Sequence, residues 1–587
     1  MSNGAGKPKP AFFIAIAAIV LGLVGFAFYR FSAKKKDDGG GGSGGSQFVD
    51  PRKPAGSAAK PTTAENPDPN AAPLTESKYE FESAQRLPEV KGSGAYKPLG
   101  TPRVVRFAVN TWAGWAPIVW ANQGHEPKKK WKDAKGGEFE VELQLIDDLE
   151  TMRNAFAAGK IHIGWATVDM LPLLIASGLK KESRTMPRVY QQIDWSNGGD
   201  GIVARDSIKN VGALKGKTIV LAQNSPSHYF LMNMLLNGGV GLKDVKLRYA
   251  KSPFQAATAF RNEKDIAAAV SWAPDIYTLT KEGSGNKMLV STLEANKLIA
   301  DVWFARADFG QENPDIIEGL VRGIFDATEE LATDQNKKTV AGLMAKLYKI
   351  DAGDAEKMLP DAHWTNYAEN REFFLVASNP TNFERTYNTA HLLYQEHYKD
   401  SQAIDARVEW DRIVDFSIIK KLGSEPKYAN QQSTYDFKFT PASAESLNVE
   451  KNEILQKTVV IKFPPNSHDL FSKVTGPSGG VVLYDGNVEF TVEQIAKLAG
   501  TFGAARIVIE GHTDGSMKGV ADEALVKDLS QRRANAVKEA LVNKFKMNPN
   551  QFSSAGYGWE KPADPADPNN HAKNRRVEVK VVPAEAQ

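Results

Sequence analysis

The sequence predicts an α/β protein in three parts: an N-terminal transmembrane helix, a two-lobed α/β domain and a small C-terminal α/β sandwich. Three observations support this organisation. An uncharged apolar run lies near the N-terminus, short apolar strands alternate with helices over residues 103–422, and a shorter alternation follows residue 457. Because a domain usually spans roughly 100–200 residues, a chain of 587 residues is expected to hold several.

The composition excludes several classes of function. Hydrophobic residues make up 42% of the chain and aromatic residues 9%, which is typical of globular domains. The formal net charge is only +3 and no basic cluster with interleaved aromatic residues occurs, so we expect no nucleic-acid partner. The absence of cysteine excludes disulfides, thiol nucleophiles and thiolate metal sites. We expect no cofactor and no metal ion.

Residues 11–31 are predicted to form a single transmembrane anchor. The 19 residues from Ala11 to Tyr29 carry no charge. That is about enough to cross a hydrocarbon core of ~30 Å. A cleaved signal peptide would have a shorter apolar region and a small-residue cleavage site, whereas basic residues follow here. The flanking charges favour a cytoplasmic C-terminal side, but we expect only residues 1–10 to lie in the cytoplasm, because of the family that the C-terminal unit resembles.

Two segments have the composition of linkers. Residues 32–102 contain the run DDGGGGSGGS and then a Pro/Ala-rich stretch without a helical or strand period. Residues 423–456 form a second, polar stretch. These boundaries leave two folded units, residues 103–422 and residues 457–587.

The first folded unit alternates strands with helices. VVRFAVN begins at Val104, FEVELQLI spans 139–146 with apolar residues at alternate positions, and KTIVLA spans 217–222. DIAAAVSWAPD follows at 265–275, and the chain is mostly helical from about residue 313 to 422. This alternation predicts a mainly parallel sheet with helices on its faces.

Candidate ligand-binding residues lie where these strands end, because open α/β sheets bind ligands at the carboxyl ends of their strands. The ends carry tryptophans with acidic neighbours, or hydroxyls and proline that begin a helix. These residues are Trp112, Trp115, Trp165, Asp169, Ser225, Ser227, His228, Trp272 and Asp275. Taken singly, a tryptophan is more often core and Ser225-Pro226 more often a plain helix cap. Their convergence on one predicted edge favours a site.

Four segments carry a resemblance: WAGWAP, FAAGKIHIGWATVDM, VGALKGKTIVLAQNSPSHYFL and AAAVSWAPD. In this order, residues 103–422 resemble the periplasmic solute-binding proteins of taurine, sulfonate, nitrate and thiamine-precursor transporters. The resemblance implies two lobes that close on a ligand, and no enzymatic activity. It implies that Trp112, Gly114 and Trp115 come from one lobe and the Ser225–His228 stretch from the other. It places Trp272 and Asp275 near the hinge and adds Asp200, in GGDGIV, at the crossing.

The charge of the ligand stays open at this point. A helix N-terminus with Ser and His suits an oxyanion such as a sulfonate, nitrate or phosphate. Tryptophans with acidic neighbours suit a cationic amine, and a zwitterion can use both. Some pyrimidine-synthesising enzymes share the fold pattern, but their cysteine-rich iron motif is impossible in a chain without cysteine.

The C-terminal unit has a second α/β pattern. TVVIKF (458–463), RIVIE (506–510) and VEVKVV (577–582) read as strands, a helix is predicted from Thr491, and 529–545 reads as another helix. GHTDG leaves the middle strand. His512 alone is a poor metal ligand, because no second histidine lies at helical spacing.

IEGHTD, LSQRRANAV, GYGWEKP and NRRVEVKV resemble, in order, the OmpA-type peptidoglycan-binding domain over about residues 457–583. The resemblance implies a pocket for the diaminopimelate of the wall peptide. Asp514, with Thr513 beside it, and Arg533 match the principal ligand positions, and Asn574 with Arg575 frames the pocket. Where the family usually has Asn, this chain has Val526, which puts affinity or peptide preference in doubt.

Together these features predict a receptor that is anchored in the bacterial inner membrane and tethered to peptidoglycan, and that binds a small solute in the periplasm for transport or sensing. A polytopic membrane protein, either a permease or a channel, is a candidate partner. The alternative is a wall-anchoring subunit of a channel or stator-like complex with a reused receptor domain. Against this alternative, the predicted span contains no Asp or Glu that could carry protons.

Overall fold

The structure is a computed structural model that describes residues 74–400, 404, 407–476 and 479–584. The predicted cytoplasmic tail, the anchor at 11–31 and most of the first linker lie outside the described residues. Within the described ranges, the helices are all too short or too polar to cross a membrane.

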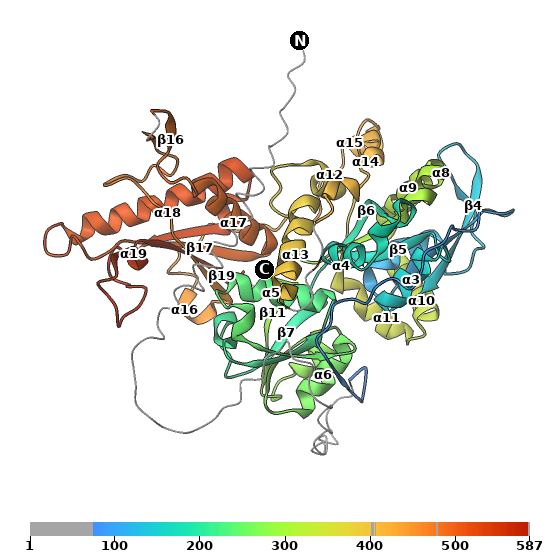
Figure 1. Ribbon diagram of the computed structural model, residues 1–587, viewed down its shortest axis with the longest axis horizontal. Coiled ribbons are helices and arrows are strands. Elements are labelled where there is room, and N and C mark those ends of the chain that lie inside the picture. Colours follow the sequence, from blue (N-terminus) through green and yellow to red (C-terminus); the bar gives the residue numbers. More distant parts are fainter. Residues whose placement is uncertain (1–73, 401–403, 405–406, 477–478, 585–587) are drawn as a thin grey trace, which may run out of the picture. The chain divides into compact units, whose positions relative to one another are not determined.

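The first lobe is built on a seven-stranded sheet in the order β13-β6-β12-β5-β2-β4-β3 (Figure 1). Its strands are β2 Val104–Val109, β3 Trp131–Lys132, β4 Glu138–Leu145, β5 Ile163–Thr167, β6 Pro187–Ser196, β12 Ala300–Arg306 and β13 Ala362–Trp364. The helices of this part are α2 Ala116–Ala121, α3 Leu149–Ala157, α4 Leu171–Ala176, α8 Ala307–Glu312, α9 Pro314–Glu330, α10 Asp334–Tyr348 and α11 Ala352–Met358. Every residue of β5 and β12 is buried, as expected for strands covered on both faces.

The second lobe has a six-stranded sheet in the order β1-β9-β8-β10-β7-β11. Its strands are β1 Phe81–Glu82, β7 Asp200–Arg205, β8 Thr218–Ala222, β9 Lys246–Ala250, β10 Ile266–Trp272 and β11 Asn286–Ser291, and its helices are α5 Pro226–Asn237, α6 Pro253–Asn262 and α7 Asp275–Leu279. Along β8, Ile219 and Leu221 pack in the core that holds α5, whereas Val220 packs with residues of α6. The two helices therefore cover opposite faces, which explains the continuous apolar run of this strand.

The expectation of mainly parallel sheets is wrong. β4, β2 and β5 are parallel in the first sheet and β9, β8 and β10 in the second, but the remaining pairs are antiparallel. The physical reason is the path of the chain, which leaves the first sheet after β6 to enter the second at β7 and returns from β11 to β12. The strands at these two crossings run against their neighbours.

Hydrogen bonds join the two crossings. Ser196 Oγ donates to Asp200 Oδ2 at 2.7 Å and lies 2.8 Å from Thr292 Oγ1. The backbone N–H of Gly198 also donates to Thr292 Oγ1, at 2.9 Å. Both connections between the lobes therefore meet at one polar cluster that includes Asp200.

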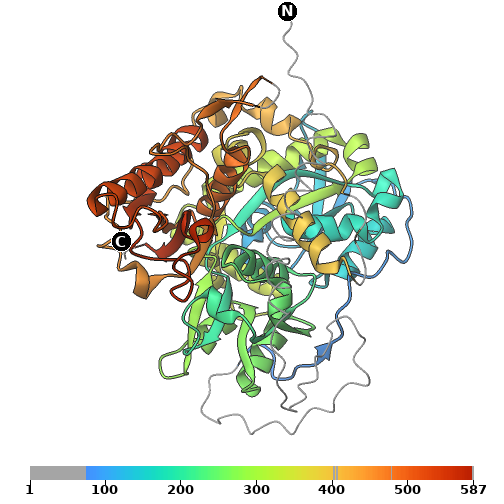
Figure 2. The same cartoon turned by 60° about the vertical axis from the view of Figure 1, so that its left-hand side comes forward.

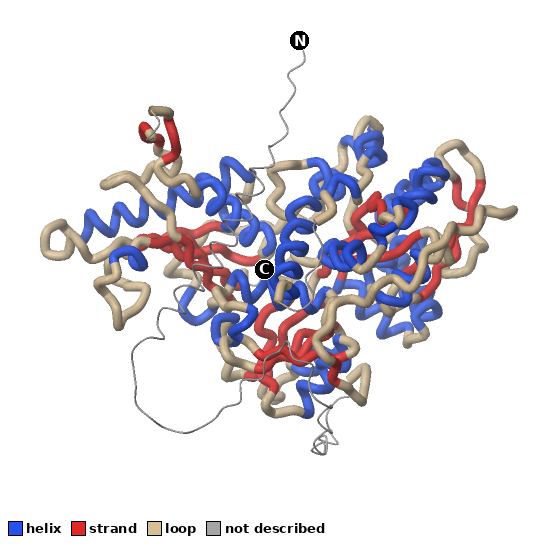
Figure 3. The backbone as a smooth tube through the Cα atoms, viewed as in Figure 1, coloured by secondary structure: helices blue, strands red, loops and turns tan. Residues whose placement is uncertain are grey.

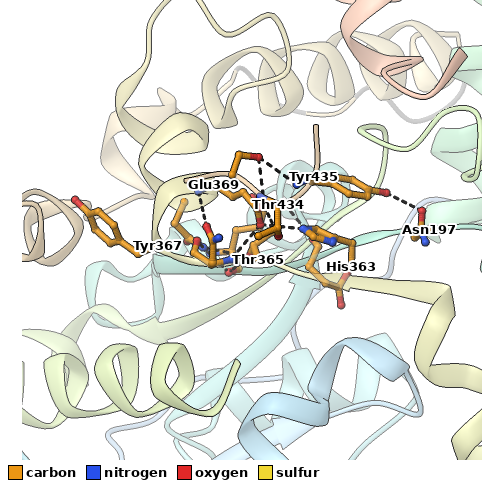
Figure 4. A network of polar contacts seen from close by, with 12 residues as sticks. Asn197, His363, Thr365, Tyr367, Glu369, Thr434 and Tyr435 are labelled. Atoms are coloured by element: carbon orange, nitrogen blue, oxygen red, sulfur yellow. Dashed lines mark hydrogen bonds and ion pairs between the residues drawn. The ribbon is translucent and has the colours of Figure 1, made fainter. Parts of the chain in front are cut away.

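A further polar network fixes part of the segment predicted as the second linker (Figure 4). The ring of Tyr435 stacks on His363 with centroids 3.8 Å apart. The His363 Nε2 atom lies 2.9 Å from the carboxylate of Glu369, which also accepts a hydrogen bond from Thr434 N–H at 2.7 Å. The Tyr435 hydroxyl donates to Asn197 at the first crossing. The helices in this part are α12 Tyr367–Leu375, α13 Phe383–Tyr398, α14 Ser417–Leu422 and α15 Pro426–Ala429.

The C-terminal unit has a four-stranded sheet in the order β14-β19-β17-β18 and a separate hairpin. Its elements are α16 Val449–Asn452, β14 Leu455–Val459, β15 Lys473–Thr475, β16 Val481–Leu483, α17 Val488–Thr501, β17 Ala505–His512, α18 Glu523–Phe545, β18 Phe552–Gly556, α19 His571–Asn574 and β19 Arg576–Pro583. Helices α17 and α18 pack against each other (Figure 2). Both begin earlier than the predicted residues 491 and 529, and Asp522 caps α18 by accepting a hydrogen bond from Ala524 N–H.

The second face of this sheet is covered as well. Val508 and Val582 pack with Ala444, Leu447 and Val449, which come from the segment predicted as a linker. The sheet and its helices are distinguished by colour in Figure 3. The polar composition of residues 423–456 did not indicate that part of this segment packs on the sheet.

Candidate functional site

Two buried carboxylates lie side by side on the first sheet. In the strand register, Asp301 of β12 is opposite Thr167 of β5 on one side and opposite Asp194 of β6 on the other. Residues opposite each other on neighbouring strands project from the same face. Asp194 is fully buried and Asp301 only 5% exposed. The row therefore places two carboxyl groups next to each other in the interior.

Asp200 adds a third buried carboxylate from the second sheet. It begins β7, opposite Trp272 at the end of β10. Its Oδ2 atom accepts the Ser196 hydrogen bond, whereas its Oδ1 atom has no hydrogen-bond partner. The indole N–H of Trp272 makes no hydrogen bond of ordinary geometry, but it lies near enough to Asp200 to act against the rise in the pKa of that carboxyl. The Trp272 N–H and Asp200 Oδ1 are therefore a donor and an acceptor that remain available for a ligand where the lobes join.

Asp169 supplies a fourth carboxylate. It lies in the short helix η2, Val168–Met170, directly after β5, and is only 1% exposed. Neither of its carboxylate oxygens has a hydrogen-bond partner of ordinary geometry, although the Thr167 hydroxyl and the Asp169 backbone N–H lie near enough to act against the effect of burial on its pKa. Helices α5 and α13 pack against η2. Because an unpaired polar group is expensive to bury, this side chain needs an explanation beyond packing.

We call Asp169, Asp194, Asp200 and Asp301 the acid cluster. Burial raises the pKa of Asp169, Asp194 and Asp200 to about 7, and the charge of Asp200 adds to the effect on Asp169 and Asp194. Burial, followed by the neighbouring charge of Asp194, raises the pKa of Asp301 well above its ordinary value. The acid cluster thus resists full ionisation as long as nothing positive lies beside it.

Trp112 and Gly114 border the acid cluster. The Trp112 indole N–H donates to Asp194 Oδ2 at 2.9 Å. A Cβ atom on Gly114 would lie 1.3 Å from the same oxygen, so no larger residue fits there. A Cβ atom on Gly199 would lie 2.5 Å from the Trp112 ring. Trp112 therefore reaches from Asp194 to the crossing between the lobes.

Two of the predicted tryptophans lie in the core. Trp115 is fully buried and donates to Asn110 Oδ1 at 2.6 Å. Trp165 is 5% exposed and donates to the Ile146 carbonyl at 3.0 Å. Both indole N–H groups are already satisfied within the chain.

The residues around the start of α5 behave differently from one another. Ser225 takes the N-cap position, but its hydroxyl donates to the Ala222 carbonyl instead of capping the helix. Ser227 Oγ is buried and has no partner. His228 packs edge-on against His397, at 4.5 Å between centroids, and burial lowers its pKa well below the ordinary value. His228 Nδ1 accepts from Asn224 N–H, so Ser227 Oγ and the N–H at His228 Nε2 are both left as buried neutral donors without partners.

The hydrogen bonds of Asp275 do not involve the acid cluster. Its Oδ1 atom accepts hydrogen bonds from both the backbone N–H and the hydroxyl of Thr75, at 2.9 and 2.7 Å. Its Oδ2 atom has no partner, and burial raises its pKa. The contacts assign it to the packing of the N-terminal segment.

The second site surrounds Asp514 at the end of β17. Asp514 accepts a hydrogen bond from Ser516 N–H at 2.9 Å and forms a close ion pair with Arg575. Burial works against ionisation, but the hydrogen bonds from Ser516 and the Arg575 guanidinium hold the pKa of Asp514 below its ordinary value. Thr513 Oγ1 is buried without a partner beside it. Asp514 is thus a carboxylate that stays ionised at neutral pH.

Arg533 and Asn574 complete this site. Arg533 Nε donates to the Ser467 carbonyl at 3.0 Å, and its guanidinium lies over the Phe463 ring, 5.0 Å from the centroid. The charge of Asp514 acts on Arg533, although no hydrogen bond joins the two side chains. Asn574 fixes the neighbouring loop by accepting from Ala563 N–H at 2.8 Å. The direct partner of Asp514 is therefore Arg575 and not Arg533.

His512 has acidic neighbours that its sequence surroundings do not reveal. Its Nε2 atom lies 3.8 Å from Glu510 Oε2 and 3.6 Å from Glu578 Oε2, and these three residues are spaced closely enough to hold a metal ion. Lys580 Nζ lies 3.0 Å from Glu510, and Arg576 Nε lies 2.6 Å from Glu578. These cations already neutralise the two carboxylates. The absence of a metal remains a prediction.

Comparison with known proteins identifies both folded units. Residues 100–345 match the NMT1-like family, and residues 483–576 match the OmpA family. The chain joins an NMT1-like solute-binding domain to a C-terminal OmpA domain. This combination agrees with both resemblances that the sequence predicts.

Individual relatives match one domain each. The taurine-binding periplasmic protein of Escherichia coli is 26% identical over 200 residues, which cover 33% of this chain and 59% of that protein. Outer membrane porin F of Pseudomonas aeruginosa is 37% identical over 91 residues, covering 15% of this chain and 25% of the porin. The crystal structure of the periplasmic aliphatic sulphonate binding protein SsuA from E. coli covers 53% of this chain and 96% of its own, with 18% identity and a TM-score of 0.41.

Sequence reasoning missed Asp194 and Asp301 in the NMT1-like domain. Both lie inside apolar strands, in QQIDWS and ADVWFA, rather than at strand ends. Burying a charge inside a strand costs free energy. An aspartate within an apolar strand segment was therefore the feature of the sequence that indicated a site. The hollow of about 940 Å³ beside Trp120 and Trp131, between α2 and α9, lies elsewhere in the domain. Size alone therefore does not locate the acid cluster.

Proposed function

We propose that this protein is a receptor that binds a small charged solute in the periplasm while it is anchored in the inner membrane and tethered to peptidoglycan. The observation that carries the solute site is the set of buried polar atoms without partners at the junction of the lobes: those of Asp169, Asp194, Asp200, Ser227 and Trp272. Native proteins pair nearly all such groups, so a cluster of open ones points to a missing ligand. The sequence leaves an oxyanion, a cationic amine and a zwitterion as candidates.

Binding of a solute is tested with the full-length protein in detergent micelles. A ligand that binds only the folded state raises the melting temperature. We expect at least one small charged solute to do so at millimolar concentration and to change tryptophan fluorescence, because Trp112 and Trp272 border the acid cluster. A complete lack of response across cations, zwitterions and anions would contradict the receptor function. The domain would then better suit a protein-contact role in a channel or stator-like complex.

The OmpA domain is proposed to bind the peptidoglycan peptide. Diaminopimelate presents an ammonium group and a carboxylate on one carbon. Asp514 suits the ammonium, and Arg533 or Arg575 suits the carboxylate, since guanidinium and carboxylate form strong paired hydrogen bonds. Because Arg575 is half exposed and Asp514 is buried, we infer that Arg575 swings away and the ligand ammonium replaces it. Co-sedimentation of the full-length protein with diaminopimelate-type peptidoglycan tests this proposal.

The membrane anchor is proposed from residues 11–31 alone. We expect a reporter fused after Gln587 to be active in the periplasm. We also expect the intact mass of the mature protein to include the apolar run. A mature chain that begins near Ala33 would contradict the anchor. Cross-linking in membranes then tests for a permease or channel partner.

A further inference from the structure

We propose that the solute carries a positively charged ammonium group, and that the acid cluster of Asp169, Asp194, Asp200 and Asp301 holds it. This inference rests on the proposed receptor function and narrows the class of its ligand. The name of the taurine-binding relative includes a ligand with an ammonium group, but neither that name nor the family matches say which residues would hold it.

The described part of the chain provides no basic side chain that pairs with the acid cluster. Among the described ion pairs, none joins a lysine or arginine to any of the four carboxylates, which come from both lobes. Four carboxyl groups without a cation form an unbalanced interior. Protons or a bound cation must supply the missing positive charge.

The second step is a comparison with other buried carboxylates of this chain. Asp133 is paired with Arg103 at 2.7 Å, Glu318 with Arg322 at 2.8 Å, and Glu578 with Arg576 at 2.6 Å. In these three places the chain provides a basic partner, whereas the buried Asp275 and Asp361 accept hydrogen bonds from the hydroxyls of Thr75 and Tyr277 instead. The acid cluster has no lysine or arginine partner within the described residues, and it lies where a ligand is expected.

The third step concerns the aromatic groups around the acid cluster. Trp112 donates to Asp194, and Trp272 lies opposite Asp200 in the strand register. The Tyr229 and Tyr394 rings are close enough to Asp169 for its charge to raise the pKa of both hydroxyls, after burial as the main cause. Carboxylates with aromatic side chains nearby are the typical surroundings of an amine or a quaternary ammonium ion.

The fourth step excludes a simple anion as the group that the acid cluster holds. An oxyanion placed beside these carboxylates would add like charge in an interior that screens charge poorly. His228 brings no positive charge, since its imidazole is buried against His397 with a lowered pKa. Ser227 Oγ remains as a neutral donor near the start of α5. A ligand with an anionic end can use it only in addition to the ammonium.

The decisive experiment uses three compounds built on the same two-carbon chain with the full-length protein in detergent: ethylammonium, taurine and ethanesulfonate. Taurine carries the ammonium and the sulfonate together, and the other two carry one each. Tetramethylammonium and glycine betaine extend the test to quaternary ammonium. Titration calorimetry and the melting temperature are the measurements.

We expect the ammonium compounds, as free cations or zwitterions, to bind and stabilise the protein, and ethanesulfonate to have no effect. Binding of ethanesulfonate without binding of any ammonium compound would overturn this inference and leave the receptor function intact. Binding of none of the five compounds would overturn the receptor function itself. If ethylammonium binds as tightly as taurine, the ligand is a cation. If taurine binds more tightly, the ligand is a zwitterion.

Asp169→Asn separates binding from structure. Because it removes an uncompensated charge, we expect the ligand-free variant to melt at a higher temperature than the wild type at pH 8, while its affinity for the ammonium compounds falls at least tenfold. Asp133→Asn is the matched control, since it breaks the pair with Arg103. We expect it to melt lower and to bind with unchanged affinity. An Asp169→Asn variant that melts lower and binds normally would assign Asp169 a structural role and overturn the proposal.

Discussion

The acid cluster and the Asp514 site handle buried carboxylates in opposite ways. In the OmpA domain, Arg575 and Ser516 satisfy Asp514 within the chain, and its pKa is lowered. In the NMT1-like domain, Asp169 has no partner and its pKa is raised to about 7. The first site is electrostatically complete when empty, so its ligand must displace a partner. The second is incomplete when empty, so its ligand supplies the missing charge.

The largest expected effect is the loss of wall binding on removing Asp514. Asp514→Ala removes the group proposed for the ligand ammonium and leaves Arg575 without its anion. Truncating one member of a buried charge pair at an interface costs about 2–5 kcal/mol, so co-sedimentation with peptidoglycan should fall well over tenfold. Arg533→Ala should have a similar effect through loss of the carboxylate contact. Lys497→Ala, outside this site, is the control, and undiminished sedimentation of both site variants would exclude this pocket.

The next effect is a pH dependence of opposite sign at the two sites. Asp169, Asp194 and Asp200 have folded-state pKa values raised from 3.8 to about 7. Their protons therefore stabilise the ligand-free fold fully below pH 4, and this contribution is lost as the pH rises from about 4 to about 7. Asp361, whose pKa is raised to about 6 by burial, acts in the same direction.

Asp514 should show the reverse sign. Its folded-state pKa lies below the ordinary value, so its contribution is present above pH 4 and is lost as the pH falls through the folded-state value. We expect Asp169→Asn to flatten the decline of the melting temperature between pH 4 and pH 7. We expect Asp514→Asn to lower the melting temperature by a constant amount above pH 4 and to flatten the decline below pH 4. Equal pH profiles for both variants and the wild type would contradict the contrast between the sites.

The two sites also differ in how well the sequence predicted them. The position of Asp514 followed from a turn motif whose residues are close in sequence, and the OmpA match confirms the domain. Trp115 and Trp165 stand at strand ends as Trp112 does, yet their N–H groups meet Asn110 and Ile146 in the core. Which way an indole points depends on packing between distant strands, which spacing along the chain does not encode.

The fold shows the same division between local and distant information. Strand β8 and helix α5 follow from local periodicity, whereas β18, FSSAG, has no period that predicts a strand. The antiparallel pairing of β7 with β10 arises from the two crossings between the lobes. The row of Thr167, Asp301 and Asp194 depends on the register of β12 against β5 and β6, and Asp301 lies more than a hundred residues beyond both of its neighbours in the row. Such juxtapositions become visible only in the folded chain.

A smaller effect is expected at Gly114. Gly114→Ala would place a methyl group 1.3 Å from Asp194 Oδ2, so either the carboxylate or the backbone must move. Overpacking of this kind costs about 1–3 kcal/mol, and the displaced Asp194 should also weaken binding of the ammonium compounds. Gly342→Ala in α10 is the matched control, because nothing lies within 4 Å of its Cβ position. We expect that helical variant to be neutral or slightly stabilised, and an equally mild outcome at Gly114 would contradict the tight contact.

The smallest expected effect comes from replacing the indole of Trp272 by a benzene ring. Trp272→Phe keeps an aromatic face opposite Asp200 but removes the indole N–H and part of the π surface. Cation–π contacts are worth about 0.5–2 kcal/mol depending on desolvation, and tryptophan is the best of the aromatic partners. We therefore expect a two- to fivefold loss of affinity for tetramethylammonium, corresponding to about 0.4–1 kcal/mol. The stability of the ligand-free protein should change little, because the lost N–H makes only a poorly aligned contact with Asp200. Trp303→Phe is the control: it removes a hydrogen bond to Gln191 at 3.1 Å in the core and should lower stability without changing affinity. If Trp272→Phe instead behaves like Trp303→Phe, Trp272 belongs to the core, and the acid cluster binds its cation through charge alone.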